Sequence, residues 1–430
     1  MPERDVSWMI DRRMALAREW DRLVEEVRKL DGFEDFLRPP RLSKLLPAAA
    51  EGAVAIVNLS RWRCDVLLVR ADGVEVVELP DLTLESVVER TNEYLGTLRR
   101  SDQAAWEFYL ARRRFDDGDR GLEAIRQYTR AKKELVEADQ ARDRTLRDIL
   151  RWLWDEIADR ALSALGLTDS PGPEQAWPRL WWCPTGPLTL LPLHAAGYHE
   201  EGVSGPAVLD RVVSSYTPTL RALLAARRPM TAAPEEERML IVALADAPDQ
   251  VPLENVVRER DLLVSLFGDR HTLLDASATT DAVRAQLPRH RWAHFSCHGS
   301  QNLADPSQGG LLLRDGSLTI ADVSAQQHEG EFAFLSACKT AVGGVSLPDE
   351  AITLAAALHF TGYRQVIGTL WAVRDRTAAD VATMVYRDLT AGGRFDPADS
   401  ARALHAAMRN LRDVARVPAH AWTPFIHIGA

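Results

Sequence analysis

Two short apolar stretches of the sequence each end in a residue that could take part in catalysis. The stretch RWAHFSCHGS contains His298 and Gly299 near its end, and the stretch EFAFLSACKT contains Cys338. A thiol polarised by an imidazole forms a pair of nucleophile and base. Gly299 would let the backbone approach a substrate closely, and the N–H groups of Gly299 and Cys338 could stabilise an oxyanion. These residues predict acyl transfer at a thiol if the fold brings them together.

The elements around these residues alternate between strands and helices, which is typical of a mainly parallel sheet with helices on both faces. Apolar runs predict strands at 238–246, 271–275, 292–297, 332–337, 363–373 and 423–429. Helical spacing predicts helices at 252–267, 279–287, 348–362, 376–390 and 398–413. In an open sheet of this kind, ligands bind beyond the carboxyl ends of the strands. His298 and Cys338 would therefore face each other if their strands are neighbours.

The first half of the chain has a different pattern. It predicts an amphipathic helix at 6–30, a β-meander at 54–59, 64–70 and 74–79, and long charged helices within 83–165. The stretch PMTAAPEEE at 229–237 is the best candidate for a linker. We therefore expect an N-terminal helical segment at 1–50, an α+β regulatory subdomain at 51–230 and a catalytic domain at 231–430.

Composition excludes several classes of function. The chain of 430 residues is 46% hydrophobic and 27% charged, with a net charge of −10, which argues against general nucleic-acid binding. Its four cysteines show no CxxC pair and no spacing typical of zinc, and we expect no cofactor and no metal. No apolar run approaches the roughly 20 residues that span a bilayer. We expect a cytoplasmic protein with reduced thiols that does not bind membranes.

The motifs HFSCHG and LSACKT, followed by DEAITLAAALHFTGYRQVIGTLWAVRD and WTPFIHIG, resemble the CHAT proteases, which are relatives of caspases and separase. The resemblance is specific over residues 239–430 and looser back to about residue 50. It implies a caspase-like sheet flanked by helices, in which Cys338 attacks a peptide carbonyl and His298 takes and returns the proton. It also leaves open that residues 51–230 form an inactive protease-like subdomain. Lys339 departs from the family, which often has an acidic residue after the cysteine.

The resemblance also suggests a substrate pocket beside the stretch LWAVRD, where Trp371 would form a wall and Asp375 would attract a basic side chain. The alternatives are that Trp371 belongs to the core and that Asp375 caps the following helix. No third residue that orients the base is evident. We expect His294 to be structural, because it alternates with the core-facing residues of its strand. Cys297 is a poor candidate for the nucleophile, because adjacent side chains of an extended strand point to opposite faces and it is next to His298.

We interpret the chain as a cysteine endopeptidase that cleaves a specific protein substrate and is held inactive until an activating protein partner or a change in its N-terminal region releases it. The family resemblance implies a role in bacterial defence or cell death. The alternative is a catalytically silent, protease-like scaffold that uses its helical region for docking. A thiol hydrolase of small esters has little support, because no GxSxG motif is present.

Overall fold

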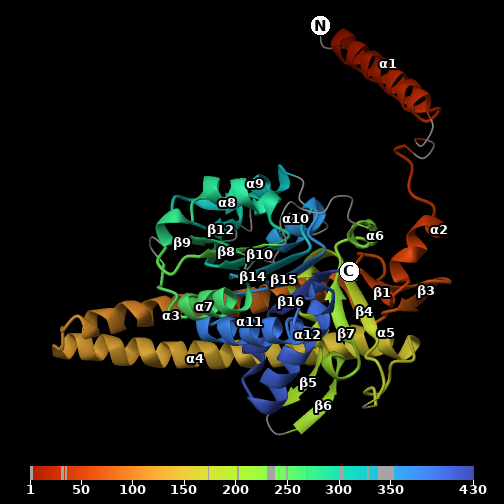
Figure 1. Cartoon of the computed structure of the whole chain (residues 1–430). Coiled ribbons are helices and arrows are strands. Elements are labelled where there is room, and N and C mark those ends of the chain that lie inside the picture. Colours follow the sequence, from red (N-terminus) through yellow and green to blue (C-terminus); the bar gives the residue numbers. More distant parts are fainter. Residues whose placement is uncertain are drawn as a thin grey trace. The chain divides into compact units, whose positions relative to one another are not determined.

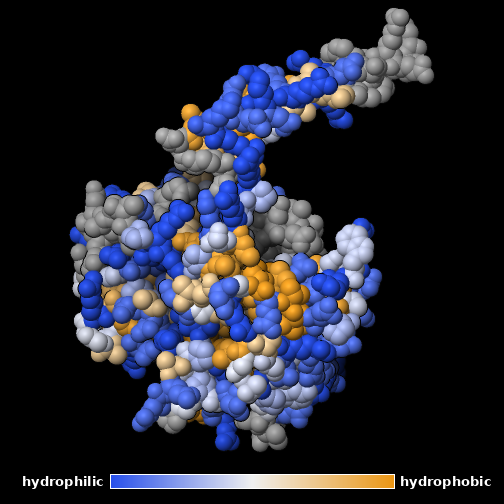
Figure 2. Space-filling model, turned by 90° about the vertical axis from the view of Figure 1, so that its right-hand side faces the viewer, coloured by the Kyte–Doolittle hydropathy of each residue, from blue (hydrophilic) through white to orange (hydrophobic). Residues whose placement is uncertain are grey.

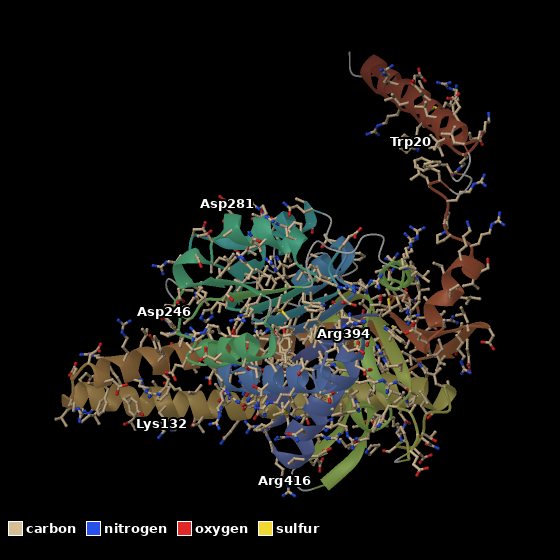
Figure 3. All side chains as sticks on the ribbon, in the orientation of Figure 1. Trp20, Lys132, Asp246, Asp281, Arg394 and Arg416 are labelled. Atoms are coloured by element: carbon tan, nitrogen blue, oxygen red, sulfur yellow. The ribbon has the colours of Figure 1, made fainter. Side chains whose placement is uncertain are left out.

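The computed structural model of the chain describes residues 3–30, 33, 36–172, 174–200, 203–229, 238–247, 250–268, 270–300, 305–326, 329–337 and 353–430. Contacts divide the chain into two compact units, Met1–Pro47 and Ala48–Ala430. The first unit is helical and contains α1 (Glu3–Val27) and α2 (Leu42–Leu45). Its Trp20 side chain is 59% exposed (Figure 3). Among the described side chains of this unit, the apolar residues Met14, Leu16 and Leu23 are exposed as well.

The second unit contains the remaining helices and the strands (Figure 1). Its helices are α3 (Leu84–Asp116), α4 (Leu122–Leu153), α5 (Asp159–Ala164), α6 (Leu220–Ala226), α7 (Val256–Leu266), α8 (Thr280–Gln286), α9 (Ile320–Ser324), α10 (Leu354–Thr361), α11 (Asp375–Leu389), α12 (Ser400–Arg409) and α13 (Ala419–Trp422). Two π-helical turns continue α4 and α12, at Trp154–Ala158 and Asn410–Val414.

Most strands of this unit join one large sheet. They are β1 (Ala53–Asn58), β2 (Asp65–Arg70), β3 (Gly73–Glu78), β4 (Arg179–Pro184), β7 (Val213–Tyr216), β8 (Met239–Ala243), β9 (Arg270–Leu274), β10 (Trp292–Ser296), β14 (Phe332–Ser336), β15 (Gln365–Thr369) and β16 (Phe425–Gly429). Two smaller sheets are formed by β5 (Gly197–Glu200) with β6 (Val203–Ala207), and by β11 (His298–Ser300), β12 (Gly310–Leu312) and β13 (Ser317–Thr319).

The described strands of the large sheet follow the order β3-β2-β1-β4-β7-β16-β15-β14-β10-β8-β9. Neighbours from β15 to β9 are parallel, and so are the neighbours from β1 to β16. The two parallel groups run in opposite directions, because β16 is antiparallel to β15. The predicted fold class, a mostly parallel sheet flanked by helices, is confirmed.

The central strands are buried along their whole length. Every residue of β8, β10, β14, β15 and β16 is buried. Strands covered by helices on both faces have no polar side, which explains why their sequences are continuous apolar runs rather than alternating ones. By contrast, the strand at one edge of the sheet, β3, is largely exposed. The core therefore lies on both faces of the sheet around β10, β14 and β15.

Helices cover both faces of the sheet. α7, α11 and α12 lie along one face, and α8, α9 and α10 lie across the other (Figure 1). α3 and α4 form a long antiparallel hairpin (Figure 1). α3 begins at a capping box, in which Thr83 and Ser86 satisfy each other's backbone N–H groups. Charged side chains such as Lys132 project from the outer side of the hairpin (Figure 3).

The domain boundaries that the sequence suggested near residues 50 and 230 stay predictions. Residues 230–237 lie outside the described residues, and segments on both sides of them contribute strands to the same large sheet. The two parts of the second unit are thus joined by backbone hydrogen bonds and a shared core.

Part of the surface of the second unit is apolar. Large apolar side chains that are exposed include Trp62, Leu122 and Val414. Figure 2 shows an apolar area in the middle of the face that it presents, surrounded by hydrophilic residues. Exposed patches of this kind often mark protein interaction sites. Within the described part of the chain, no helix combines the length and the apolar character needed to cross a bilayer.

Candidate active site

The carboxyl ends of β10 and β14 lie side by side in the sheet. The two strands are parallel, and Ser296 at the end of β10 is in register with Ser336 at the end of β14. Beyond β14, the carbonyl of Ala337 accepts a hydrogen bond from Thr369 Oγ1 at 2.9 Å, at the end of β15. The predicted nucleophile Cys338 and the adjacent Lys339 lie outside the described residues.

His298 lies at this edge and begins a new strand. The sequence predicted a strand that ends at residue 297, whereas the structure shows a further strand, β11, in which His298 is in register with Leu312. The His298 side chain is half-buried, and its Nε2 lies 2.8 Å from the carbonyl oxygen of Val251. A carbonyl can only accept, so Nε2 carries a proton, and Nδ1 of the neutral ring is the nitrogen that can take up a proton.

The surroundings of His298 favour its neutral form. Burial lowers the pKa of His298 below its usual value. The hydrogen bond to the Val251 carbonyl and the negative charge of Asp375 act in the opposite direction and offset part of this effect. A neutral imidazole with one nitrogen held by a carbonyl is suited to act as a general base near pH 7.

A small hairpin holds β11 in place. Leu311 of β12 and Leu318 of β13 are almost completely buried. The turn between them is tied to the region before α8, because the backbone N–H of Arg314 donates to the carbonyl of Ala278. β11 pairs with β12 along its length. The hairpin therefore fixes the backbone that carries His298.

Gly299 is the second residue of β11 and lies in register with Leu311. β11 is at the edge of its three-stranded sheet, so one side of its backbone faces away from β12. This placement leaves room for the predicted role of Gly299 in an oxyanion hole, which stays a prediction together with that of the Cys338 N–H.

The two predicted pocket residues follow β15 and have different surroundings: Trp371 is buried against α3, and Asp375 begins α11. Trp371 is 2% exposed, and its ring packs edge-on against Tyr94 of α3 with centroids 5.2 Å apart. Asp375 is the first residue of α11, and its Oδ2 accepts hydrogen bonds from the backbone and the side chain of Asn255. Trp371 thus lies in the core in this structure, and Asp375 lies close enough to influence His298. Their roles in a substrate pocket stay predictions.

Two partners of the site were not found from the sequence. The Val251 carbonyl, which orients His298, is a backbone group, and a backbone group leaves no signal in residue type. Asn255 is 120 residues from Asp375. Asn255 directly precedes α7 but makes no side-chain capping hydrogen bond, and no local pattern of residues indicates its contact with Asp375.

The other cysteines are poor nucleophiles. The side chains of Cys64, Cys183 and Cys297 are buried. Burial raises the pKa of Cys183 to about 12, so this thiol is not ionised at neutral pH. Among the residues that the structure describes, no group of three or more His, Cys, Asp and Glu side chains is arranged to hold a metal ion.

The sheet order and the helices on both faces define a caspase-like α/β fold. A family model for the CHAT domain matches residues 143–430, which is more than half of the chain. The chain therefore belongs to the CHAT domain family. A comparison with curated proteins found no match.

Two solved structures of the Saccharomyces cerevisiae separase–securin complex are similar to this chain. The structure at 3.0 Å resolution matches with a TM-score of 0.57 and 9% identity, over 95% of this chain and 32% of the other. The structure at 2.6 Å matches with a TM-score of 0.57 and 10% identity, over 90% of this chain and 30% of the other. At this identity the likeness shows the fold, and this chain spans about a third of the length of the separase chain.

Proposed function

We propose that the protein is a cysteine endopeptidase in which His298 is the base and Cys338 the nucleophile. The observation that carries the proposal is the hydrogen bond from His298 Nε2 to the Val251 carbonyl, at the sheet edge where the chain reaches Ala337. An imidazole held in this way keeps Nδ1 as the nitrogen that can take up a proton. Cys338 directly follows Ala337 in the sequence.

In the proposed reaction, His298 Nδ1 takes the proton of the Cys338 thiol, and the sulfur attacks the carbonyl carbon of a peptide bond. The N–H groups of Gly299 and Cys338 stabilise the resulting oxyanion. His298 then gives its proton to the leaving amine, which departs and leaves a thioester. Water attacks the thioester with His298 again as base, which releases the acid and restores the thiol.

We further propose that a protein partner controls this activity and that the enzyme acts in the cytoplasm, in a bacterial defence or cell-death pathway. The separase chain in the similar structures is in complex with securin, a second protein. The exposed apolar side chains of the second unit offer a surface on which such a partner could dock.

The proposal is tested with the full chain, its Cys338→Ala variant and its His298→Ala variant, each incubated with a cell proteome. New protein N-termini are then identified by sequencing. We expect specific cleavage by the unchanged protein and none by either variant. Cleavage by both variants at the same sites would show that another enzyme or another site is responsible.

A catalytically silent scaffold is the second candidate. It is favoured by the apolar side chains that α3 and α4 expose, including Trp106, Leu110 and Ile125. A thiol-reactive probe separates the two functions, because the buried Cys64, Cys183 and Cys297 should react slowly in the folded protein. Rapid labelling of Cys338 that requires His298 supports the protease, and labelling that is slow at every cysteine supports the scaffold.

A further inference from the structure

The segment that carries the Val251 carbonyl is held mainly by hydrogen bonds. The Val251 side chain is 37% exposed, so burial of this side chain does little to fix its position. Two contacts on its C-terminal side are well defined. The backbone N–H of Leu253 donates to the carbonyl of Ala245, and Asn255 is bound by Asp375. The position of the carbonyl that orients His298 therefore depends on these anchors.

The contact between Asn255 and Asp375 is the stronger anchor. Asp375 Oδ2 accepts from the Asn255 backbone N–H at 2.7 Å and from its side-chain Nδ2 at 2.8 Å. Both hydrogen bonds have a charged acceptor, and such bonds are about twice as strong as neutral ones. They join the beginning of α11 to the residue before α7. Asp375 also acts on His298 directly through its charge.

The α3–α4 hairpin supports the residues just before Asp375. Arg374 Nη2 donates to Asp139 Oδ2 of α4 at 2.9 Å. Asp139 is itself held by Ser101 of α3, whose hydroxyl donates at 2.8 Å, and by Arg142 at 3.0 Å. The nearby Trp371 ring packs against the same hairpin. The start of α11 is thus anchored to the hairpin on one side and to Asn255 on the other.

We propose that Asp375 is a positioning residue for His298, which fixes the Val251 carbonyl through Asn255 and thereby sets the orientation of the base. The inference rests on the proposed function, since it concerns the same pair of His298 and Cys338. It assigns Asp375 a role in the chemistry of the base, whereas the sequence suggested a contact with the substrate.

The test measures the rate at which iodoacetamide alkylates Cys338 in the full chain, as a function of pH. This reagent is small and does not need a substrate pocket, so a pocket residue would leave its rate unchanged. We expect Asp375→Ala to lower the rate at neutral pH by about tenfold or more, because the base loses its alignment. Loss of the Asp375 charge also lowers the pKa of His298 further. The pH at which the alkylation rate falls on the acid side should therefore be lower in this variant than in the unchanged protein.

Asp380→Ala is the matched control. Asp380 also lies on α11 and also binds the region of α7, through Arg258 at 2.7 Å. We expect this variant to keep the rate and the pH profile of the unchanged protein. If Asp375→Ala behaves like Asp380→Ala, the positioning role is wrong.

A reciprocal exchange covers the case in which Asp375→Ala fails to fold. Asn255→Asp places two carboxylates together and should lower the rate, whereas the double variant Asn255→Asp/Asp375→Asn can remake both hydrogen bonds and should recover most of it. A double variant no faster than Asn255→Asp would contradict the proposal. The His298→Ala variant separates the two hypotheses. If it leaves the alkylation rate unchanged, the proposed function itself fails; if it slows alkylation and Asp375→Ala does not, only the positioning role fails.

Discussion

His294 and Glu259 contact each other in the interior, with His294 Nε2 3.0 Å from Glu259 Oε2 and both side chains at most 1% exposed. The other ring nitrogen of His294 lies 3.1 Å from the hydroxyl of Tyr386 on α11. His294 is on β10, the strand that leads to His298, and Glu259 is on α7, the helix that follows Asn255. One buried contact therefore links the strand that precedes His298 to the helix that follows the segment of Val251.

This contact gives a first prediction. Glu259→Ala should lower the free energy of unfolding by about 3–5 kcal/mol, because His294 loses its buried partner at Nε2. Glu259→Gln keeps an oxygen that can accept a hydrogen bond, so it should lower the free energy of unfolding clearly less than Glu259→Ala does. Urea denaturation measures both values. Equal and small losses in the two variants would show that the contact contributes little to stability.

Gly310 gives a second prediction, because a Cβ atom at this position would meet the backbone carbonyl of Leu318. Gly310→Ala should force β12 and β13 apart and cost about 1–3 kcal/mol of stability. β12 pairs with β11, so alkylation of Cys338 should also slow down. Gly73→Ala is the control, since nothing lies within 4 Å of its Cβ position. Thermal melting that shows the same change for both glycines would contradict this account.

Trp371 gives a third prediction, which also separates its two possible roles. Trp371→Ala should lower the free energy of unfolding by about 3–5 kcal/mol, as expected for removal of a large buried ring. Trp371→Phe keeps a ring against Tyr94 and should retain most of the stability. A role in the substrate pocket would instead appear as a higher KM for a peptide substrate with little change in melting temperature.

Acid sensitivity is the fourth prediction. Burial lowers the pKa of five histidines well below the usual value of 6.5, namely His194 (about 3), His199 (about 4), His359 (about 4), His405 (about 3) and His427. The unfolded chain therefore binds more protons than the folded one once the pH falls below 6.5. The stability that these neutral side chains contribute is present above pH 6.5 and is lost progressively toward pH 4.

His405 allows this explanation to be tested at one site. It lines a cavity of about 640 Å³ beside Trp177, and both of its ring nitrogens are buried without a hydrogen-bond partner among the described residues. His405→Leu should reduce the fall in unfolding free energy below pH 6.5 by about 1.4 kcal/mol per pH unit. Denaturation at pH 7 and pH 5 measures the change. A pH dependence identical to that of the unchanged protein would exclude His405 as a contributor.

Much of the fold could be predicted from local patterns. The central strands are buried on both faces, so their apolar runs are continuous and easy to recognise, as in Phe332–Ser336. The beginning of α8 was also marked, since Thr279 accepts a hydrogen bond from the backbone N–H of Ala282. The helix expected at 348–362 begins only at Leu354 in the structure, with Thr353 as its cap. The end of α10 at Gly362, with φ of 129°, follows from the freedom of glycine.

What could not be predicted depends on contacts between distant segments. The strand β11 is three residues long and exists because it pairs with β12, so the sequence predicted no strand after residue 297. The direction of β16 depends on which neighbour it meets and has no signature in its residues. The contact of the Val251 carbonyl with His298 joins segments 47 residues apart, and Asn255 of the same segment is bound by Asp375, which is a further 120 residues away.

The antiparallel junction of β15 and β16 has a consequence for the order of events during synthesis. Phe425–Gly429 pairs with all five residues of β15 and also with β7, so it joins the two oppositely directed halves of the sheet. The ribosome makes this segment after every other strand of the described sheet. Until then, β15 is an open edge, and no strand of the described sheet joins the half that carries His298 to the other half. We therefore expect the described sheet to be completed only once the segment of β16 has been synthesised, later than the segments that carry His298 and Ala337.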